Sequence, residues 1–130
     1  MIYLDHNATT PLMPEALAAM VAAMHNAWGN PSSPHRFGHA ARELLEAARA
    51  QMAVGMGCKP SELIFCASGT QADNLALRGA AHALLARGRH IVTTAIEHPA
   101  VLNTCRALQA EGFLLTILPV TAQGLLDPEA

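Results

Sequence analysis

The sequence predicts an α/β fold in which helices flank parallel strands. Between Glu62 and Leu118, short apolar runs alternate with longer amphipathic segments, which is the pattern of strands and helices in turn. The intervening segments are long enough for the helical crossovers that parallel strands require. In addition, 52% of the 130 residues are hydrophobic and 14% are charged, so the chain has enough apolar material for the core of one domain.

Two helices are expected before this alternating region, after a short extended start at residues 2–4. The first helix spans Pro14 to Asn26, where apolar residues recur at helical spacing. The loop GNPSSP, residues 29–34, follows it, because Gly, Asn and Pro favour turns. The second helix spans His35 to Met56, carries an apolar stripe opposite a charged one, and ends at Gly57.

The alternating region is expected to contain three strands and two helices. The strands span Glu62 to Cys66, His90 to Thr94 and Phe113 to Leu118. The helices span Thr70 to Arg87 and Ala100 to Glu111.

Composition argues against several classes of protein. The formal net charge is −2, with 8 basic and 10 acidic residues spread along the chain, so we expect no nucleic-acid partner. No apolar run approaches the about 20 residues of a membrane helix. An acid stands near the N-terminus where a signal peptide would carry positive charge, so we expect no membrane association and a cytoplasmic location. The spacing of the three cysteines predicts neither a disulfide framework nor a metal site; they are Cys58, Cys66 and Cys105.

The turn Ser68-Gly69-Thr70 lies between a predicted strand and a predicted helix. The N-terminus of such a helix presents free amides and the positive end of its dipole, which attract an anion. Glycine permits close approach of the backbone, and the two hydroxyls can donate to phosphate oxygens. The alternative, which the local pattern alone favours, is that Ser68 or Thr70 only caps the helix.

His98 follows the next predicted strand, in the segment Ala95-Ile96-Glu97-His98-Pro99. In a parallel sheet this segment opens at the same carboxyl edge as the Ser68-Gly69-Thr70 turn, so His98 is expected to face whatever the turn holds. An imidazole there can stack on an aromatic ring or move protons. The alternative is an ordinary loop residue or helix cap. Two further loops, residues 5–11 and 29–33, are dense in hydrogen-bonding side chains, and their simplest interpretation is polar turns.

Four segments of the chain resemble the N-terminal part of the cysteine desulfurases of the nitrogen-fixation and iron–sulfur-cluster type. In the family's order and spacing they are IYLDHNATTP, GNPSSPHRFGHAAR, SGTQADNLALRGAA and TTAIEHPAVLNTCRALQAEGF. These enzymes belong to the class V aminotransferase family and have the fold type I architecture of pyridoxal phosphate (PLP) enzymes. The resemblance implies a single partial domain, truncated at its C-terminus. Residues 1–13 form an N-terminal segment, and residues 14–130 begin the PLP-binding large domain. Asp127 and Pro128 are typical of the start of a further helix.

The resemblance also implies a cofactor, pyridoxal 5′-phosphate, and residues that contact it. Gly69 and Thr70 match the family's phosphate-binding turn, although many members have alanine at the position of Gly69. His98 matches the histidine that stacks on the pyridine ring. The N-terminal segment that lines the active site is matched by Asn7, Ala8 and Thr9.

The complete enzyme implied by the resemblance converts L-cysteine to L-alanine and transfers the sulfur for assembly of iron–sulfur clusters or other sulfur-containing cofactors. A homodimer and a sulfur-acceptor or scaffold protein are the implied partners. The family's Schiff-base lysine, its aspartate at the pyridine nitrogen and its sulfur-accepting cysteine lie beyond residue 130, so this chain contains no expected catalytic residue and is expected to be inactive alone. Lys59, the single lysine, is expected at the opposite edge of the sheet, and Cys105 is expected to be a buried helical thiol.

Two alternatives remain from the sequence. One is another class V PLP lyase, such as a selenocysteine lyase. The other is a non-catalytic interaction module derived from this fold, which would expose a large apolar face and oligomerise or dissolve poorly.

Overall fold

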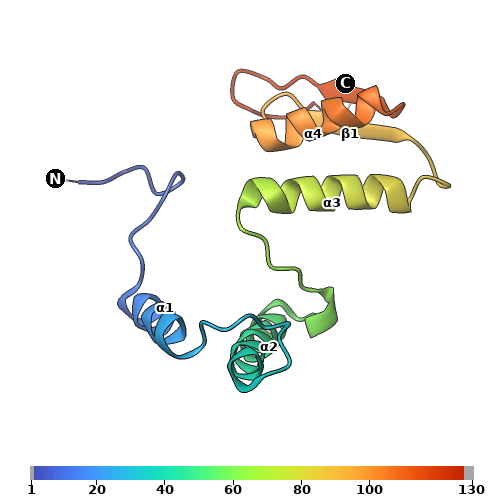
Figure 1. The fold of residues 1–130 in the computed structure, drawn as a ribbon. Helices are drawn as coiled ribbons and strands as arrows, with labels where there is room; N and C mark the ends of the chain where they lie inside the picture. The colour runs from blue at the N-terminus through green and yellow to red at the C-terminus, as the bar shows by residue number, and fades with distance from the viewer. Residues whose placement is uncertain (1, 128–130) are drawn as a thin grey trace. The chain divides into compact units, whose positions relative to one another are not determined.

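The computed structural model of the protein describes residues 2–127, which fall into two compact units, Met1–Ile64 and Phe65–Ala130 (Figure 1). Pro128 lies outside the described residues, and so does the helix that Asp127 and Pro128 would begin. Among residues 2–127, none of the helices combines the length and the apolar character needed to cross a membrane.

The first unit contains helices α1 (Pro14–Asn26) and α2 (Arg36–Met56) and the short 3-10 helix η1 (Pro60–Glu62). The predicted bounds of α1 are confirmed, and α2 begins one residue later than predicted. His35 is the N-cap of α2, because its ring accepts a hydrogen bond from the Gly38 amide. Gly57 ends α2 in the left-handed conformation, with φ of 67°, which glycine adopts at little cost.

Small residues make up the buried part of the first unit. Gly38, Ala41 and Ala53 are the buried positions of α2. At Gly38 the chain is so close that a Cβ atom would stand 2.3 Å from the Ser33 carbonyl oxygen. The Arg42 guanidinium fastens the same loop to α2 by donating to the Pro31 carbonyl at 2.7 Å. Large apolar side chains of α1 and α2 therefore stay on the surface, where the two helices border an apolar groove.

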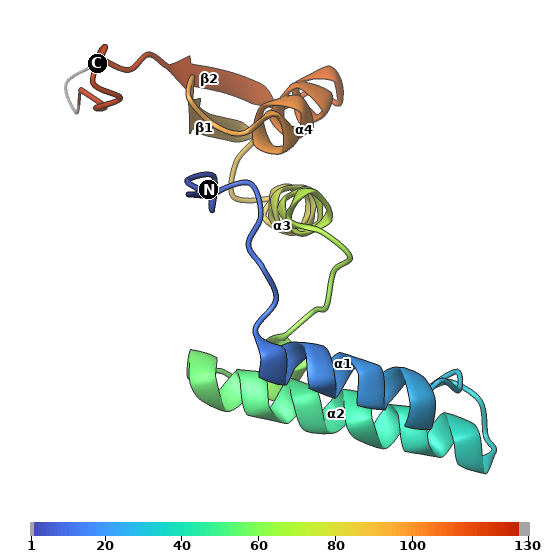
Figure 2. The same cartoon turned by 90° about the vertical axis from the view of Figure 1, so that its left-hand side faces the viewer.

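The second unit contains α3 (Gly69–Ala83), β1 (His90–Thr94), α4 (Pro99–Ala110) and β2 (Leu114–Leu118). The two strands pair in parallel, with His90 opposite Leu114, as a β-α-β order requires. Helix α4 packs against β2 and α3 packs against α4 (Figure 2). The core of the unit lies between these elements and contains the buried side chains of Cys105, Leu108 and Phe113.

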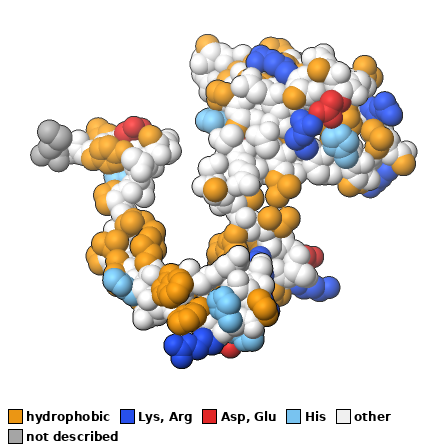
Figure 3. Space-filling model, in the orientation of Figure 1, with side chains coloured by type: hydrophobic (Ala, Val, Ile, Leu, Met, Phe, Trp, Pro, Cys, Tyr) orange, Lys and Arg blue, Asp and Glu red, His pale blue; other side chains and the backbone are white. Residues whose placement is uncertain are grey.

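One face of the two-stranded sheet is open among the described residues. Val92 is 55% exposed and Leu114 is 67% exposed, and the register places both on the same face. Parallel strands are normally covered on both faces, because their side chains are apolar on both. Hydrophobic side chains are visible on the surface of both units (Figure 3). The exposed apolar surface expected from the sequence is therefore present.

The predicted strand from Glu62 to Cys66 is wrong. Glu62 ends η1, and no residue of the segment 63–66 belongs to a strand. The backbone of Leu63 is extended, but its carbonyl accepts a hydrogen bond from the Arg49 guanidinium at 2.7 Å. In a strand, a neighbouring strand would donate to this carbonyl instead. The expectation that Lys59 lies at the far edge of the sheet depended on this strand and falls with it.

Smaller differences occur at the ends of the other elements. Helix α3 starts one residue before Thr70. It ends at Ala83 rather than at Arg87, and a series of turns follows Ala83. Helix α4 starts at Pro99, whose fixed φ suits the first turn. β2 starts after Phe113, because the Phe113 amide bonds to the Leu108 carbonyl and closes α4 together with Gly112 at φ of 97°.

Candidate functional site

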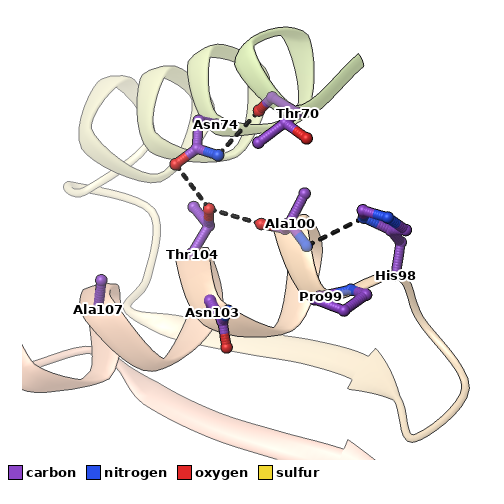
Figure 4. Close-up of a pocket in the computed structure, with 8 residues that line it drawn as sticks. All are labelled: Thr70, Asn74, His98, Pro99, Ala100, Asn103, Thr104 and Ala107. Atoms are coloured by element: carbon purple, nitrogen blue, oxygen red, sulfur yellow. Dashed lines mark hydrogen bonds between the residues drawn. The ribbon is translucent and has the colours of Figure 1, made fainter. Parts of the chain in front are cut away.

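The N-terminal halves of α3 and α4 border an open pocket of about 370 Å³ (Figure 4). All of its lining residues belong to the second unit; they are Thr70, Asn74, His98, Pro99, Ala100, Asn103, Thr104 and Ala107. The structure thus brings together Thr70 and His98, two residues that the sequence identified separately. Gly69 is the first residue of α3, directly before Thr70.

Ser68 is the N-cap of α3. Its hydroxyl oxygen accepts a hydrogen bond from the Gln71 amide at 3.2 Å, and the Gln71 side chain accepts one from the Ala67 amide at 2.7 Å. The capping interpretation of the turn is therefore confirmed for Ser68. Within the part of the chain that the structure describes, the amides of Gly69 and Thr70 have no acceptor. These two N–H groups, at the positive end of a 15-residue helix, can bind an anion.

Gly69 is not required by the geometry of the turn. Its φ is not positive, and a Cβ atom built on it would meet nothing within 4 Å. The space in front of the backbone at this position is therefore open, which leaves room for a ligand and also for an alanine side chain.

His98 is the N-cap of α4, and its side chain is fixed by that role. Nδ1 accepts a hydrogen bond from the Ala100 amide at 3.1 Å. In the neutral ring the hydrogen is therefore on Nε2, because Nδ1 uses its lone pair to accept this bond and so carries no hydrogen. The helix-cap interpretation of His98 is confirmed, and the cap also holds the exposed imidazole at the border of the pocket.

Thr70 and His98 meet by a different route from the one predicted. The sequence placed them together because each followed a strand of one parallel sheet. The structure describes no strand in residues 63–66, before the Ser68-Gly69-Thr70 turn, and the two residues meet instead because α3 packs against α4.

Asn74 and Thr104 were not identified as site residues from the sequence. The Asn74 side chain donates to the Thr70 carbonyl at 2.8 Å and accepts from the Thr104 hydroxyl at 2.8 Å. A signal was available for Thr104, since it lies four residues after Ala100 and four before Leu108, both buried. A hydroxyl in a buried helical stripe requires a hydrogen-bond partner.

Asn7, Ala8 and Thr9 lie in the first unit, so their place beside the pocket stays a prediction. They belong to a turn in which the amides of Ala8 and Thr9 donate to the Asp5 carbonyl at 3.1 and 3.4 Å. The Tyr3 hydroxyl donates to the Asp5 carbonyl at 2.9 Å, and it lies 3.1 Å from the Thr9 carbonyl.

Other chemically reactive groups lie outside the pocket lining. Cys105 is 1% exposed, and burial together with the negative charge of Glu97 raises the pKa of its thiol. It is therefore a buried helical thiol, as expected, and a poor nucleophile. Lys59 is the N-cap of η1, and its amide donates to the Glu62 carboxylate at 2.7 Å. In residues 2–127, no group of three His, Cys, Asp or Glu side chains could hold a metal ion.

Comparison with known proteins identifies relatives over nearly the whole chain. The chain is 44% identical over 128 residues to a protein named cysteine desulfurase IscS from Dictyoglomus turgidum, covering 98% of this chain and 32% of the relative. It is 48% identical over 123 residues to a protein named putative cysteine desulfurase IscS 1 from Bacillus subtilis, with 95% and 32% covered.

Solved structures give the same result. A structure named NIFS-like protein matches with a TM-score of 0.87 and 37% identity, covering 98% of this chain and 35% of that chain. A structure of SspA in complex with cysteine matches with a TM-score of 0.84 and 35% identity. The α/β fold is therefore that of about a third of these proteins, and the chain spans about a third of the length of the curated relatives it matches. Because the profile described as Aminotransferase class-V matches residues 2–130, the chain belongs to the class V aminotransferase family, with similarity to the N-terminal part of cysteine desulfurases.

Proposed function

We propose that the chain is the N-terminal portion of a PLP-dependent cysteine desulfurase, and that its part in that enzyme is to bind one side of the cofactor. The complete enzyme would convert L-cysteine to L-alanine and transfer sulfur to an acceptor or scaffold protein. It would act as a homodimer. Identity of 44% to a protein named cysteine desulfurase and of 48% to one named putative cysteine desulfurase supports the substrate class.

The observation that carries the proposal is the pocket that Thr70 and His98 share. The residues present fit pyridoxal 5′-phosphate. Two amides at the start of α3 would bind its phosphate together with the Thr70 hydroxyl, and the open space at Gly69 would let the phosphate approach the backbone. The dipole of α3 would favour the negative charge.

His98 would lie against the pyridine ring. Its bond from the Ala100 amide restrains the imidazole, so binding would not have to order a mobile side chain. With the hydrogen on Nε2, the ring would also have one N–H group to donate at the pocket. When bound, PLP supplies the electron sink for reactions at the substrate's α-carbon.

The chemical steps would be performed by groups outside this chain. About two thirds of each relative's length has no counterpart in the 130 residues. Burial raises the pKa of Cys105 and makes it unsuitable as the sulfur acceptor, and Lys59 is proposed not to hold the cofactor. The isolated chain is accordingly expected to bind PLP weakly and to have no desulfurase activity.

The phosphate-binding role is tested by substitution of Thr70. Thr70→Ala is expected to weaken binding of PLP to the 130-residue chain by about ten- to a hundredfold, because a hydrogen bond to a charged group is lost. Equilibrium dialysis measures the affinity. Thr116→Ala is the matched control, since it removes a threonine hydroxyl that bonds to His90 outside the pocket lining.

Two results would contradict the proposal. Unchanged affinity in Thr70→Ala would mean that the turn only caps the helix. A stoichiometric lysine adduct on Lys59 after borohydride reduction, found by mass spectrometry, would mean that the chain carries its own anchoring lysine.

The exposed apolar surface bears on the alternative of a non-catalytic interaction module. Val92 and Leu114 on the open sheet face would have to be covered by a further chain segment or by a partner. The same exposure is expected of a piece of a larger enzyme, so PLP binding separates the two functions. A selenocysteine lyase would share the pocket and differ in the groups outside this chain.

A further inference from the structure

Polar groups within hydrogen-bonding distance of one another extend from Thr70 to His98 (Figure 4). Asn74 Nδ2 donates to the Thr70 carbonyl at 2.8 Å, and Asn74 Oδ1 lies 2.8 Å from the Thr104 hydroxyl. Thr104 Oγ1 also lies 2.7 Å from the Ala100 carbonyl. The Ala100 amide donates to His98 Nδ1 at 3.1 Å. This series of polar groups therefore extends from the first turn of α3 to the N-cap of α4.

The direction of each bond in this series is determined by chemistry. The Thr70 carbonyl can only accept, so the amide nitrogen of Asn74 faces it, and a flipped Asn74 would place two oxygens against each other. Asn74 Oδ1 then faces Thr104, whose hydroxyl must donate. Because a hydroxyl has one hydrogen, Thr104 donates either to Asn74 or to the Ala100 carbonyl.

Thr104 does not need Asn74 to satisfy its hydroxyl. Its side chain is 3% exposed and can bond to the Ala100 carbonyl within its own helix. The bond to Asn74 uses the same hydrogen in place of the bond to Ala100, and it joins two polar groups across the interface of α3 and α4. Such a bond restricts sliding and rotation of one helix against the other more than apolar contacts alone do.

We propose that Asn74 and Thr104 are positioning residues that hold the anion-binding end of α3 and the His98 ring at the separation that a phosphorylated pyridine requires. This inference rests on the function proposed above. The phosphate and the ring of such a ligand are covalently joined, so both sites are filled together only if their separation is already correct. A phosphate ion alone needs only the end of α3.

The experiment compares two probes on the 130-residue chain by isothermal titration calorimetry. Pyridoxine 5′-phosphate has the phosphate and the ring but no aldehyde, so it cannot react with Lys59. Inorganic phosphate tests the end of α3 alone. Thr104→Val is expected to weaken pyridoxine 5′-phosphate binding by about three- to tenfold, the effect of one lost hydrogen bond, and to leave phosphate binding within about twofold. Valine keeps the branched shape of threonine and fills the same space.

Three further variants sharpen the test. Thr104→Ser keeps the hydroxyl and is expected to restore binding of pyridoxine 5′-phosphate. Thr116→Val loses a threonine bond to His90 outside the pocket lining and is expected to change neither affinity. The double variant Asn74→Ala/Thr104→Val is expected to bind pyridoxine 5′-phosphate as well as the single variant with the lower affinity does. The two losses should not add, because the two residues act through one shared hydrogen bond.

The outcomes are distinct. Equal weakening of the binding of both probes by Thr104→Val would show a general structural role and overturn the positioning role. Unchanged binding of both probes would also overturn the positioning role. If the unaltered chain binds pyridoxine 5′-phosphate no more tightly than inorganic phosphate, the proposed function itself fails and the positioning role with it. Circular dichroism of each variant establishes that it is folded.

Discussion

The two units differ in what their helices bury. In the first unit, α2 buries only Gly38, Ala41 and Ala53. In the second unit, α4 buries Ala100, Thr104, Cys105 and Leu108, and Leu108 has no exposed surface. Both helices have strong local signals for helix formation, so the difference does not come from helix propensity. It comes from the presence or absence of neighbouring elements that cover the apolar stripe.

Helix formation and core formation are therefore separate consequences of the sequence. An apolar stripe at helical spacing is enough to predict α2, but not to predict that the stripe is covered. Burial of large side chains contributes most of the stability of a helix in a protein. The second unit should therefore respond more strongly than the first to loss of an apolar side chain.

The largest expected effect is that of truncating Leu108. Leu108→Ala should lower the free energy of unfolding by about 2–4 kcal/mol, because it removes buried methyl groups and leaves a cavity. Leu44→Ala in α2 is the matched control, since Leu44 is 47% exposed; it should cost less than about 1.5 kcal/mol. Urea unfolding followed by circular dichroism measures both. Equal losses would mean that α2 is covered as well as α4, and the contrast between the units would be broken.

The next effect, at Gly38, concerns the close packing of small residues in the first unit. A helical glycine is usually stabilised by replacement with alanine, by about 0.5–1 kcal/mol. At Gly38 a Cβ atom would stand 2.3 Å from the Ser33 carbonyl oxygen and 2.7 Å from that of Asn30. Gly38→Ala is therefore expected to destabilise the chain, by about 1–3 kcal/mol.

Gly55 provides the control for this prediction in the same helix. A Cβ atom there would meet nothing within 4 Å, so Gly55→Ala should raise the melting temperature while Gly38→Ala lowers it. Thermal unfolding followed by circular dichroism compares the two. An increase in both variants would mean that the loop at residues 29–34 moves away from α2 at little cost.

The sequence predicted most of the fold because most of the signals are local. The bounds of α1 and β1 follow from apolar spacing and from short apolar runs between turns. The strand from Glu62 to Cys66 could not be predicted correctly in the same way. A strand depends on a partner elsewhere in the chain, whereas a helix satisfies its own backbone groups. Here the Leu63 carbonyl bonds to Arg49 instead.

The residues of the site could be predicted from the sequence only in part, because only some of them have local signals. Thr70 and His98 follow recognisable turns, so they could be found from the sequence. Asn74 and Thr104 are 30 residues apart along the chain and bond across two helices. Neither spacing nor propensity predicts that contact, because it depends on how α3 packs against α4.

Cysteine chemistry has the smallest expected effect on stability, and it measures how well the interior of each unit is shielded from solvent. Cys58 in the first unit is half-buried, and Cys105 in the second is buried. Iodoacetamide at pH 8 should label Cys105 far more slowly than Cys58, because burial and Glu97 raise the pKa of the Cys105 thiol and limit access to it. Mass spectrometry of peptides measures the two rates. Labelling in urea provides the control, since both thiols should then react alike.

The raised pKa of Cys105 also fixes the sign of a pH dependence. Above the ordinary thiol pKa of about 8.5, the unfolded chain loses the Cys105 proton while the folded chain keeps it. The folded state then binds more protons, so the contribution of this thiol to stability is complete below about pH 8.5 and is lost as the pH rises through its higher folded value.

Glu97→Gln removes one cause of the raised pKa, so it should speed labelling of Cys105 and flatten the decline in unfolding free energy between pH 8 and 10. If Cys105 and Cys58 reacted equally fast in the native chain, the interior of the second unit would be open to solvent, and the contrast in burial between α4 and α2 would not hold in solution.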